Sequence, residues 1–510
     1  MDQLLSYGAF DFFQSKTAVN TGELGDSGLR AQFTYLQKRR DGYADNLLVP
    51  DKLDPGAYNV DAIRASVAYD RSGPLRLDYV FDYNHRKSVA TAYQLASARP
   101  DILDYINASS ALGSATPQIA RDRLGSLSLD DDGPISDKVQ GHALTAELDL
   151  ASNLTLRSIT SYRKWDNSVI NDLDGNANLV GFVVDPILFA GGPFTPLGVQ
   201  PISLFHLTFE RRQHQWTQEL NLLGDIGERT KFVLGAFYFD EVAHEENPTF
   251  LTFILPSAAP IAVTPTVSVN SFGVNIASNM IYRYQSRSKA AFGQIATEVA
   301  DRLSLTGGLR YTHDEKSLRQ TTPFSRDLNR EFNKLNWAVT LDYRLNDTAM
   351  TYARVATGYK AGGFNARSAN NGFEPENLTS YELGIKSELF DHRLRLNAAL
   401  FHAAHKDVQV GQFLAGSGGS LGTTVNAGKA EYWGVEVEFT ALLVDNLTVN
   451  GNVGLLDRKY KSFEIRDPVT DNLVDIAKSA RFLYSPDTTA NLGVEYRLPS
   501  LEVGRLTARV

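Results

Sequence analysis

The stretch LNWAVTLDYRL, residues 335–345, decides the fold class of this chain. Every second residue is apolar or aromatic, namely Leu335, Trp337, Val339, Leu341, Tyr343 and Leu345. The residues between them are mostly polar, namely Asn336, Ala338, Thr340, Asp342 and Arg344. Successive side chains of a β-strand point to opposite faces, so the segment has one apolar face and one polar, charged face. The pattern predicts a strand with an apolar medium on one side and water on the other.

The same alternation recurs along the whole chain. Residues 433–443, for example, place Trp433, Val435 and Val437 opposite Glu436 and Glu438. Aromatic residues at strand ends are typical of the girdles at membrane–water interfaces. In all, the patterns predict about 17 strands, at 5–21, 29–40, 61–70, 75–87, 142–150, 154–165, 214–223, 231–243, 285–299, 303–316, 335–345, 349–361, 378–390, 393–410, 431–444, 447–463 and 486–498.

Very short and very long connections alternate between these strands. The short ones contain Asp, Asn and Gly, which tolerate tight hairpin dihedrals; they lie at 71–74, 151–153, 300–302, 346–347, 391–392 and 445–446. The long ones, at 84–141, 165–213 and 241–284, would be unusual inside a compact soluble domain. We therefore predict an all-β fold, an antiparallel transmembrane β-barrel with short periplasmic turns and long extracellular loops.

The bulk composition agrees with this fold and excludes several others. The chain has 510 residues, 43% of them hydrophobic, and a barrel can use all of 1–510 as one domain. It has no run of 18 apolar residues, which excludes a helical membrane span. The absence of cysteine excludes disulfide scaffolds and thiolate metal sites. A net charge of −9 without a basic patch argues against a nucleic-acid partner.

The two ends of the sequence indicate that this chain is part of a larger barrel protein. Residues 1–4 show neither the basic nor the apolar region of a secretory signal, which an outer-membrane protein needs. An odd number of strands cannot close an ordinary bacterial barrel, and residues 506–510 begin another strand pattern. We expect the natural protein to extend beyond both ends.

The last third of the chain resembles the barrel of a TonB-dependent outer-membrane receptor of the siderophore-receptor type. The stretches that carry the resemblance are Tyr352–Lys360, Gly362–Asn365, Pro375–Leu378, Tyr381–Lys386, Leu394–Ala399, Lys406–Gln409, Asn426–Gly428 and Gly434–Glu438, with Arg40–Tyr43 and Asn46 early in the chain. Each is weak alone, but their combination in this order is specific.

The resemblance implies a wide barrel of about 22 strands with a plug in its lumen. About five strands and the N-terminal plug, with its TonB-contacting box, would then lie outside this sequence. It further implies a monomer in the bacterial outer membrane that contacts lipid, binds a scarce ligand and couples to the TonB complex. A ferric siderophore is the commonest cargo implied, and vitamin B12, haem, saccharides and aromatic compounds are alternatives.

Several candidate sites in the sequence do not fit a known chemistry. His402 and His405 are an odd number of residues apart, so on one strand they point to opposite faces and cannot share a metal ion. His244, Glu245 and Glu246 are interpreted as a solvated rim where a strand runs into a loop.

Two further candidates resemble ligand-binding loops but depart from their patterns. Residues 172–178 resemble a calcium loop, but the glycine is at the fourth position and Val183 takes the twelfth, so a polar turn is the better interpretation. Residues 130–132 are likewise interpreted as a solvated loop. Gly428 and Lys429 do not complete a phosphate loop, because Gly422 is too distant and Ala430 replaces the Ser or Thr that would hold magnesium. Residues 416–422 are glycine-rich, but no helix follows them.

Arg395, Glu436 and Glu438 face the lumen of the expected barrel and are candidates for contact with a plug or a substrate, although polar groups line any wet lumen. No catalytic, cofactor or metal constellation emerges, so we expect a protein that is not an enzyme and has no cofactor. The loops 84–141, 165–213, 241–284 and 411–430 are where we expect specificity to reside.

Three functions compete on this sequence. The first is TonB-energised uptake of a ferric siderophore or a similar bulky ligand. The second is a passive porin without a plug, whose about 16–18 strands are close to the predicted number. The third is a soluble all-β or propeller protein, which would need a repeat of about 40–50 residues that the sequence does not contain.

Overall fold

The computed structural model describes residues 1–48, 54–71, 73–130, 133–185, 195–323, 325–368, 372–416, 419–466, 472–499, 504 and 506–510. These residues form strands almost throughout, with one α-helix among them, α1 (Pro100–Ala111). No helix in the described part is long and apolar enough to cross a membrane.

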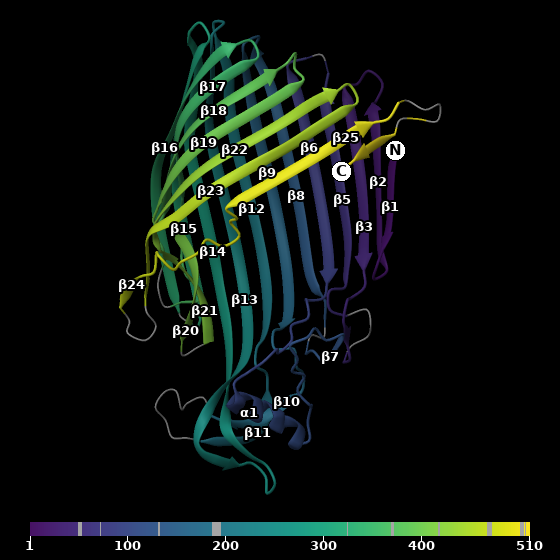
Figure 1. Ribbon diagram of the computed structural model, residues 1–510, viewed down its shortest axis with the longest axis vertical. Helices are drawn as coiled ribbons and strands as arrows, with labels where there is room; N and C mark the ends of the chain where they lie inside the picture. Colours follow the sequence, from purple (N-terminus) through teal and green to yellow (C-terminus); the bar gives the residue numbers. More distant parts are fainter. Residues whose placement is uncertain are drawn as a thin grey trace.

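One antiparallel sheet forms the body of the molecule (Figure 1). Each of its wall strands pairs with the next wall strand along the chain. They are β1 (Asp2–Gly8), β2 (Phe12–Glu23), β3 (Leu29–Arg40), β5 (Tyr58–Asp70), β6 (Leu75–Ser88), β8 (Ile135–Ala151), β9 (Leu154–Asp172), β12 (His206–Ile226), β13 (Thr230–Ala262), β14 (Ser268–Ala300), β15 (Leu303–Thr322), β16 (Arg326–Asn346), β17 (Ala349–Lys360), β18 (Glu376–Leu389), β19 (Leu394–Lys406), β22 (Gly428–Val444), β23 (Leu447–Arg466), β25 (Thr488–Arg497) and β26 (Thr507–Arg509).

The sheet curls, so that β17 to β25 lie in front of β9 to β14 in Figure 1. In the described part of the chain, no pairing joins β1 to β26. The sheet has 22 strands in all, but β10 (Leu179–Val184), β11 (Pro196–Ile202) and β24 (Leu473–Asp475) belong to loops rather than to the wall. The 22 strands of the sheet are therefore not all strands of the wall.

The predicted alternation of faces is confirmed in β16. Leu335 and Trp337 expose 55% and 39% of their surface on the outer face, although both are large and apolar. The neighbouring polar residues lie on the other face, which forms the wall of the lumen. Large apolar side chains that remain exposed in a continuous band are expected where lipid, rather than protein, covers them.

All the predicted short turns lie at one end of the wall, uppermost in Figure 1 and called the turn end here. The predicted single strand 5–21 is wrong, because it is a hairpin of β1 and β2 that reverses at Phe10 and Asp11, which both have positive φ. The predicted strand 393–410 also stops earlier, at Lys406, before Asp407 with φ 56°.

The strands β8 to β16 extend well beyond the predicted bounds at the opposite end, which we call the loop end. The predicted loop 241–284 is wrong in large part, since β13 and β14 are 33 residues each and stay paired through it. Outside the lipid zone both faces of a hairpin meet water, so the alternation that marks a strand in the sequence disappears while the ladder of hydrogen bonds continues.

The described parts of the predicted loops 84–141 and 165–213 fold, together with the loop-end part of β14, into a small cap with a core of its own (Figure 1). The helix α1 was not predicted; it begins at Pro100 with Asp101 in its first turn, both favourable at a helix start. Its Tyr105 is fully buried and donates a hydrogen bond of 2.9 Å to the Phe182 carbonyl in β10. The core of the cap consists of Tyr105, Ile106, Leu179, Phe182, Val183, Val184, Ile202, Val269, Phe272 and Val274.

Candidate functional site

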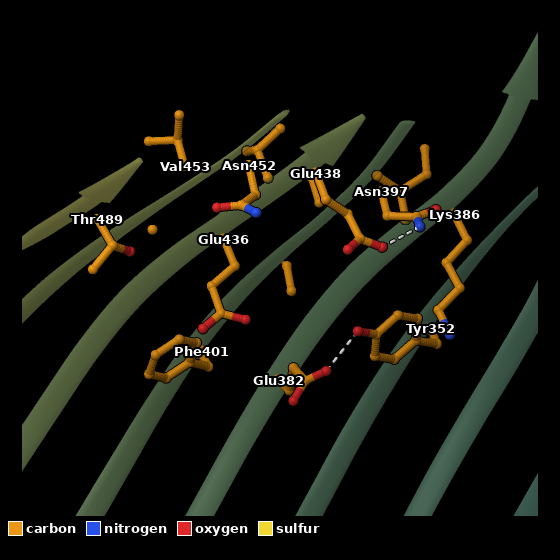
Figure 2. Close-up of a pocket in the computed structure, with 15 residues that line it drawn as sticks. Tyr352, Glu382, Lys386, Asn397, Phe401, Glu436, Glu438, Asn452, Val453 and Thr489 are labelled. Carbon is orange, nitrogen blue, oxygen red and sulfur yellow. Dashed lines mark hydrogen bonds between the residues drawn. The ribbon is translucent and has the colours of Figure 1, made fainter. Parts of the chain in front are cut away.

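A shallow pocket of about 410 Å³ opens on the lumen face of β17, β18, β19, β22 and β23 (Figure 2). Alternate residues of these strands supply its polar lining. Three carboxylates dominate it, those of Glu382, Glu436 and Glu438. Two of the three are residues that the sequence analysis singled out as lumen-facing candidates.

Two of these carboxylates have partners within the wall. The Tyr352 hydroxyl donates to Glu382 at 2.5 Å, and the Asn397 amide donates to Glu438 at 2.6 Å (Figure 2). Among the described residues Glu436 has no hydrogen-bond or ion-pair partner within the protein, and in Figure 2 it lies beside Phe401. Glu436 is therefore an acceptor available to whatever occupies the lumen.

Arg395 has a different position from the two glutamates. It lies close to the turn end and donates to Glu388 at 2.8 Å. Its charge is already paired, so the structure favours the structural interpretation of Arg395 over a ligand contact.

A second lumen-facing cluster lies at the loop end, around Glu245. Its carboxylate accepts hydrogen bonds from Arg211 at 3.0 Å, Arg367 at 2.8 Å and the Tyr282 hydroxyl at 3.1 Å. Only 10% of the Glu245 side chain is exposed. The prediction of a solvated rim is thus wrong for Glu245. This residue lies on the inner face of β13, whereas His244 and Glu246 lie on its outer face and have other neighbours.

Aromatic packing completes this cluster. The Arg211 guanidinium lies 4.1 Å from the centre of the Phe209 ring, and that of Arg367 lies 5.4 Å from it. Such stacks hold guanidinium groups in place while their edges remain able to donate hydrogen bonds. Arg367 belongs to the loop 361–375 between β17 and β18, so its pair with Glu245 of β13 ties that loop to a distant strand.

The family-like stretches of the last third meet at this same loop. Asn365 is buried, and its side chain exchanges two hydrogen bonds with the Thr424 backbone of β21 (Gly419–Asn426), at 2.9 and 2.8 Å. It therefore acts as a strand partner for that hairpin. Arg326 donates to the Asn365 carbonyl at 2.6 Å, and Gln320 donates to the Ala366 carbonyl at 2.8 Å.

The other side of the loop is fixed in the same way. Asn426 accepts from the Glu374 amide at 2.6 Å and donates to the Glu374 carbonyl at 2.8 Å. Glu376 accepts from the backbone of Gln409, in β20 (Gln409–Gly416), at 2.7 Å. The stretches that carry the family resemblance thus fasten one loop and one hairpin together at the mouth of the barrel.

No pattern in the sequence indicates the Glu245 cluster. Arg211, Glu245 and Tyr282 sit on three different strands, and Arg367 is 122 residues from Glu245. The alternation of faces along each strand shows on which face each residue lies, but it does not show that the four side chains meet.

The two histidines of β19 are placed as their spacing predicts. His402 faces outward, between the rings of Tyr381 and Trp433, with centroids 6.0 and 4.2 Å away. His405 faces the lumen, where its ring lies 3.6 Å from Glu376. They share no ligand.

Within residues 172–178, the carboxylates accept hydrogen bonds from backbone amides. Asp172 accepts from the amides of Asp174 and Gly175, at 2.9 and 3.0 Å. Asp174 accepts from the amides of Leu204 and Phe205, at 2.8 and 3.1 Å. These bonds shape a turn, and the part of the chain that the structure describes contains no cluster of His, Asp or Glu suited to a metal ion.

The remaining candidates are structural features or lie outside the description. Gly428 begins β22 with φ 132°, and a Cβ there would lie 2.4 Å from the Ser462 carbonyl oxygen. Residues 416–422 join β20 to β21 in a hairpin whose positions 417 and 418 are outside the described residues. Residues 131 and 132 of the predicted acidic loop are also outside them, while Asp130 donates its amide to Asp172 at 3.1 Å.

An antiparallel wall with an apolar exterior, a charged lumen, tight turns at one end and folded loops at the other defines an outer-membrane β-barrel. The chain matches the family described as TonB-dependent receptor-like, beta-barrel, over residues 79–509. It therefore belongs to that family, whose members are outer-membrane receptors and transporters and not enzymes.

Known relatives agree with this assignment. The chain is 31% identical over 175 residues to the pesticin receptor of Yersinia enterocolitica, a match that covers 32% of this chain and 25% of that protein. It is 25% identical over 186 residues to the metal-pseudopaline receptor of Pseudomonas aeruginosa, over 36% of this chain and 22% of the receptor. These matches thus span about a quarter of the relatives' length.

The fold itself is shared more widely. The structure of the ferric yersiniabactin uptake receptor from Yersinia pestis superposes with a TM-score of 0.68 at 18% identity, over 98% of this chain and 66% of that one. The family match favours the receptor over the porin and over a soluble all-β protein.

Proposed function

We propose that this chain forms the barrel, over 1–510, of a receptor that takes up a bulky ferric siderophore-type complex across the outer membrane with energy supplied through TonB. The relatives named above are a ferric yersiniabactin uptake receptor, a metal-pseudopaline receptor and a pesticin receptor, which supports a bulky cargo of this kind. In this proposal the loop end lies outside the cell, and the ligand enters there.

The observation that carries the proposal is the Glu245 cluster with its loop. Guanidinium groups stacked on Phe209 face the lumen at the loop end and suit anionic, ring-bearing chelates. The buried Glu245 carboxylate is one of the attachments that hold the loop 361–375 over this surface, beside its hydrogen bonds to Gln320, Arg326 and β21. A ligand that competes for Arg211 and Arg367 would weaken the attachment of the loop to β13, which couples binding to a change at the mouth of the barrel.

Uptake of radioactive iron tests the proposal in the bacterium that carries the gene. We expect deletion of the gene to abolish uptake of at least one ferric siderophore in a panel, and its reintroduction to restore uptake. A protonophore or loss of TonB should abolish the same uptake.

Two variants connect this experiment to the structure. Arg367→Gln should raise the concentration for half-maximal uptake, whereas Arg319→Gln, an exposed outward arginine, should not. Uptake that depends on the gene but persists without TonB would overturn energised transport and establish a passive pore. Unchanged uptake of every chelate after deletion would overturn the siderophore assignment.

A further inference from the structure

Three positive side chains surround one tyrosine ring at the loop end of β3, β5 and β6, which are neighbours in the wall (Figure 1). The Lys38 ammonium lies 5.5 Å from the centre of the Tyr58 ring, and the guanidinium groups of Arg40 and Arg86 lie 5.0 and 5.8 Å from it. Register explains the arrangement, since Arg40 is directly opposite Tyr58, and Lys38 and Arg86 are both opposite Val60. We call Lys38, Arg40, Arg86 and Tyr58 the Tyr58 cluster.

The alternation of faces places this cluster inside the barrel. Phe33 and Val67 are apolar residues of the outer face that expose 46% and 45% of their surface. Lys38 is five residues from Phe33, and Tyr58 is nine residues from Val67. Both separations are odd, so Lys38 and Tyr58 point to the opposite face, toward the lumen.

The positive charge of the cluster is only partly compensated by the protein. In the part of the chain that the structure describes, the ion pairs of β3, β5 and β6 are made by other residues, and none includes Lys38, Arg40 or Arg86. Asp137 of β8 lies directly opposite Arg86, but it is not within ion-pair distance and accepts a hydrogen bond from the Trp165 indole. Three positive charges against the one negative charge of Asp137 leave a net charge of +2 on this part of the wall.

A pocket of about 490 Å³ adjoins the cluster on its loop-end side. Arg40 and Arg123 line it together with Tyr43, and the Arg123 guanidinium lies 4.4 Å from the centre of the Tyr43 ring. Apart from Gln94, the other described residues of the lining are apolar, and none of them is acidic. The pocket thus combines two guanidinium groups with an aromatic ring and provides no counter-charge of its own.

Arg40 belongs to both the cluster and the pocket, and its hydrogen bonding is incomplete. Its Nη2 donates to the Gly56 carbonyl at 2.9 Å. Its Nε is buried and has no acceptor among the described residues. A buried donor of a charged group that lacks an acceptor is costly, and such a group in a folded protein calls for an explanation. An anion bound beside Arg40 would provide one, because it would balance the charge that the protein leaves unpaired.

We propose that the Tyr58 cluster and the adjoining pocket bind an anionic, ring-bearing group of the cargo, such as an aryl carboxylate. A guanidinium group can hold a carboxylate with two parallel hydrogen bonds and can also stack on an aromatic ring. The flat aromatic surfaces of Tyr43 and Tyr58 already hold these cations in place. The site therefore suits a ligand in which negative charge and a ring lie close together.

This inference rests on the proposed function and narrows its class of substrate. Arg86, Asp137, Asn167 and Arg211 are direct neighbours in one row across β6, β8, β9 and β12. Three strand spacings separate Arg86 from Arg211 of the Glu245 cluster, which corresponds to about 14 Å along the wall. A cargo that contacts both clusters would carry anionic groups about this far apart.

Binding of a fluorescent polyanion tests the site on the natural protein, purified from outer membranes in detergent micelles. The probe is pyrenetetrasulfonate, a planar aromatic polyanion, and its fluorescence anisotropy reports binding. The test variant is Lys38→Gln/Arg40→Gln/Arg86→Gln. The retarded mobility of unheated protein on gels confirms that each variant is folded.

The matched control variant is Arg76→Gln/Arg157→Gln/Arg163→Gln. It removes the same charge from the lumen face, but these three arginines are already paired with Glu147 or Asp82. Two competing acids then test the preference for a ring. Trimesate is an aromatic tricarboxylate, tricarballylate is an aliphatic one, and both are used at a pH where they are fully ionised.

We expect the test variant to bind the probe about thirty-fold more weakly or worse, because three charged contacts are lost, and the control variant less than about fivefold more weakly. Trimesate should displace the probe from the wild-type protein at a lower concentration than tricarballylate, because its ring can stack on a guanidinium group. Equal losses of affinity in the two variants, or equal displacement by the two acids, would overturn the proposal.

If the test variant fails to fold, Arg86→Gln/Arg123→Gln replaces it, because both of these side chains are exposed. This double variant should bind the probe about tenfold more weakly, and unchanged binding would count against the site. The two proposals fail separately. Uptake that depends on the gene, with equal probe binding by test and control variants, would refute the site alone, whereas the expected probe binding without gene-dependent uptake would refute the proposed function alone.

Discussion

Replacement of Glu245 by glutamine should weaken the attachment of the loop 361–375 to β13. The substitution keeps the shape of the side chain but removes the charge that Arg211, Arg367 and Tyr282 share. Two guanidinium groups are then left together without a counter-charge. This end of the loop should open more often, because the Arg367–Glu245 pair is the only ion pair between the loop and β13 among the described residues, and the hydrogen bond of Arg367 to Asn247 carries no opposite charge.

The magnitude follows from burial. Removal of one partner from a fully buried ion pair costs about 3–5 kcal/mol. Glu245 is close to that limit with 10% of its side chain exposed, but Arg211 and Arg367 expose 30% and 36% and regain hydration when the pair breaks. We therefore expect about 2–3 kcal/mol, which corresponds to a roughly 30- to 150-fold larger open population.

Limited trypsin digestion after Arg367 measures this population in the folded protein, since slow cleavage of a transiently open segment tracks its opening equilibrium. Glu374→Gln is the matched control. It also removes a carboxylate that ties the loop to the wall, since Glu374 of the loop pairs with Arg330 of β16, but Glu374 is 63% exposed, so the change should be worth less than about 1 kcal/mol. Cleavage rates that rise equally in the two variants, or in neither, would refute the assignment of the clamp to Glu245.

Three further outcomes are expected. Gly28→Ala should destabilise the barrel by about 2–4 kcal/mol, because Gly28 has φ 73° and a Cβ would lie 2.7–2.8 Å from Arg71 and the Asp70 carbonyl; Gly25→Ala, with φ 59° and open space around it, should cost only about 1–2 kcal/mol. Urea unfolding in detergent measures both. Val339→Arg should cost about 2–4 kcal/mol in a bilayer, whereas Thr340→Arg on the lumen face should cost little, and equal effects in refolding into lipid vesicles would contradict the assigned faces. Burial and the nearby Asp172 raise the pKa of Asp174 from 3.8 to about 6, so the neutral form is favoured in the folded cap. This stabilisation of about 3 kcal/mol is complete below about pH 4 and is lost as the pH rises through 6. The thermal stability of the cap should fall over that range in the wild type and change less in Asp174→Asn, as hydrogen exchange of α1 would show.

The wall of the barrel could be predicted from the sequence because lipid imposes a local rule. Each strand must turn an apolar face outward. Segments such as 335–345 therefore alternate apolar and polar residues with a period of two, whatever the rest of the chain contains. The turns were predictable for a similar reason, since a tight reversal at Asp347 or Asn446 needs only local backbone freedom. Where the rule does not apply, as in β13 and β14 beyond the lipid zone, the same reasoning predicted a loop instead of a hairpin.

The cap and the mouth of the barrel depend on contacts that no local pattern encodes. Tyr105 is buried because it meets Phe182, 77 residues away, across Gly181, where a Cβ would lie 2.3 Å from the tyrosine hydroxyl. The motif residues Asn365 and Asn426 could be identified as family features in the sequence. Their side chains form hydrogen bonds with backbone groups in place of a neighbouring strand. This role is evident only where the loop and β21 lie together in the structure.

The outer face of β12 to β15 shows how far the neighbours of a side chain depend on register. Arg212, His244, Arg283 and Arg319 are unremarkable as single charges in the sequence, because each is one polar residue near a strand end. Only the pairing of β12 to β15 shows that they are direct neighbours, and a shift of one residue in any strand would turn one of them toward the lumen. Opposite charges meet on this face in a way that only the register reveals, since Asp166 lies directly opposite Arg212, and Arg287 is paired with Asp240.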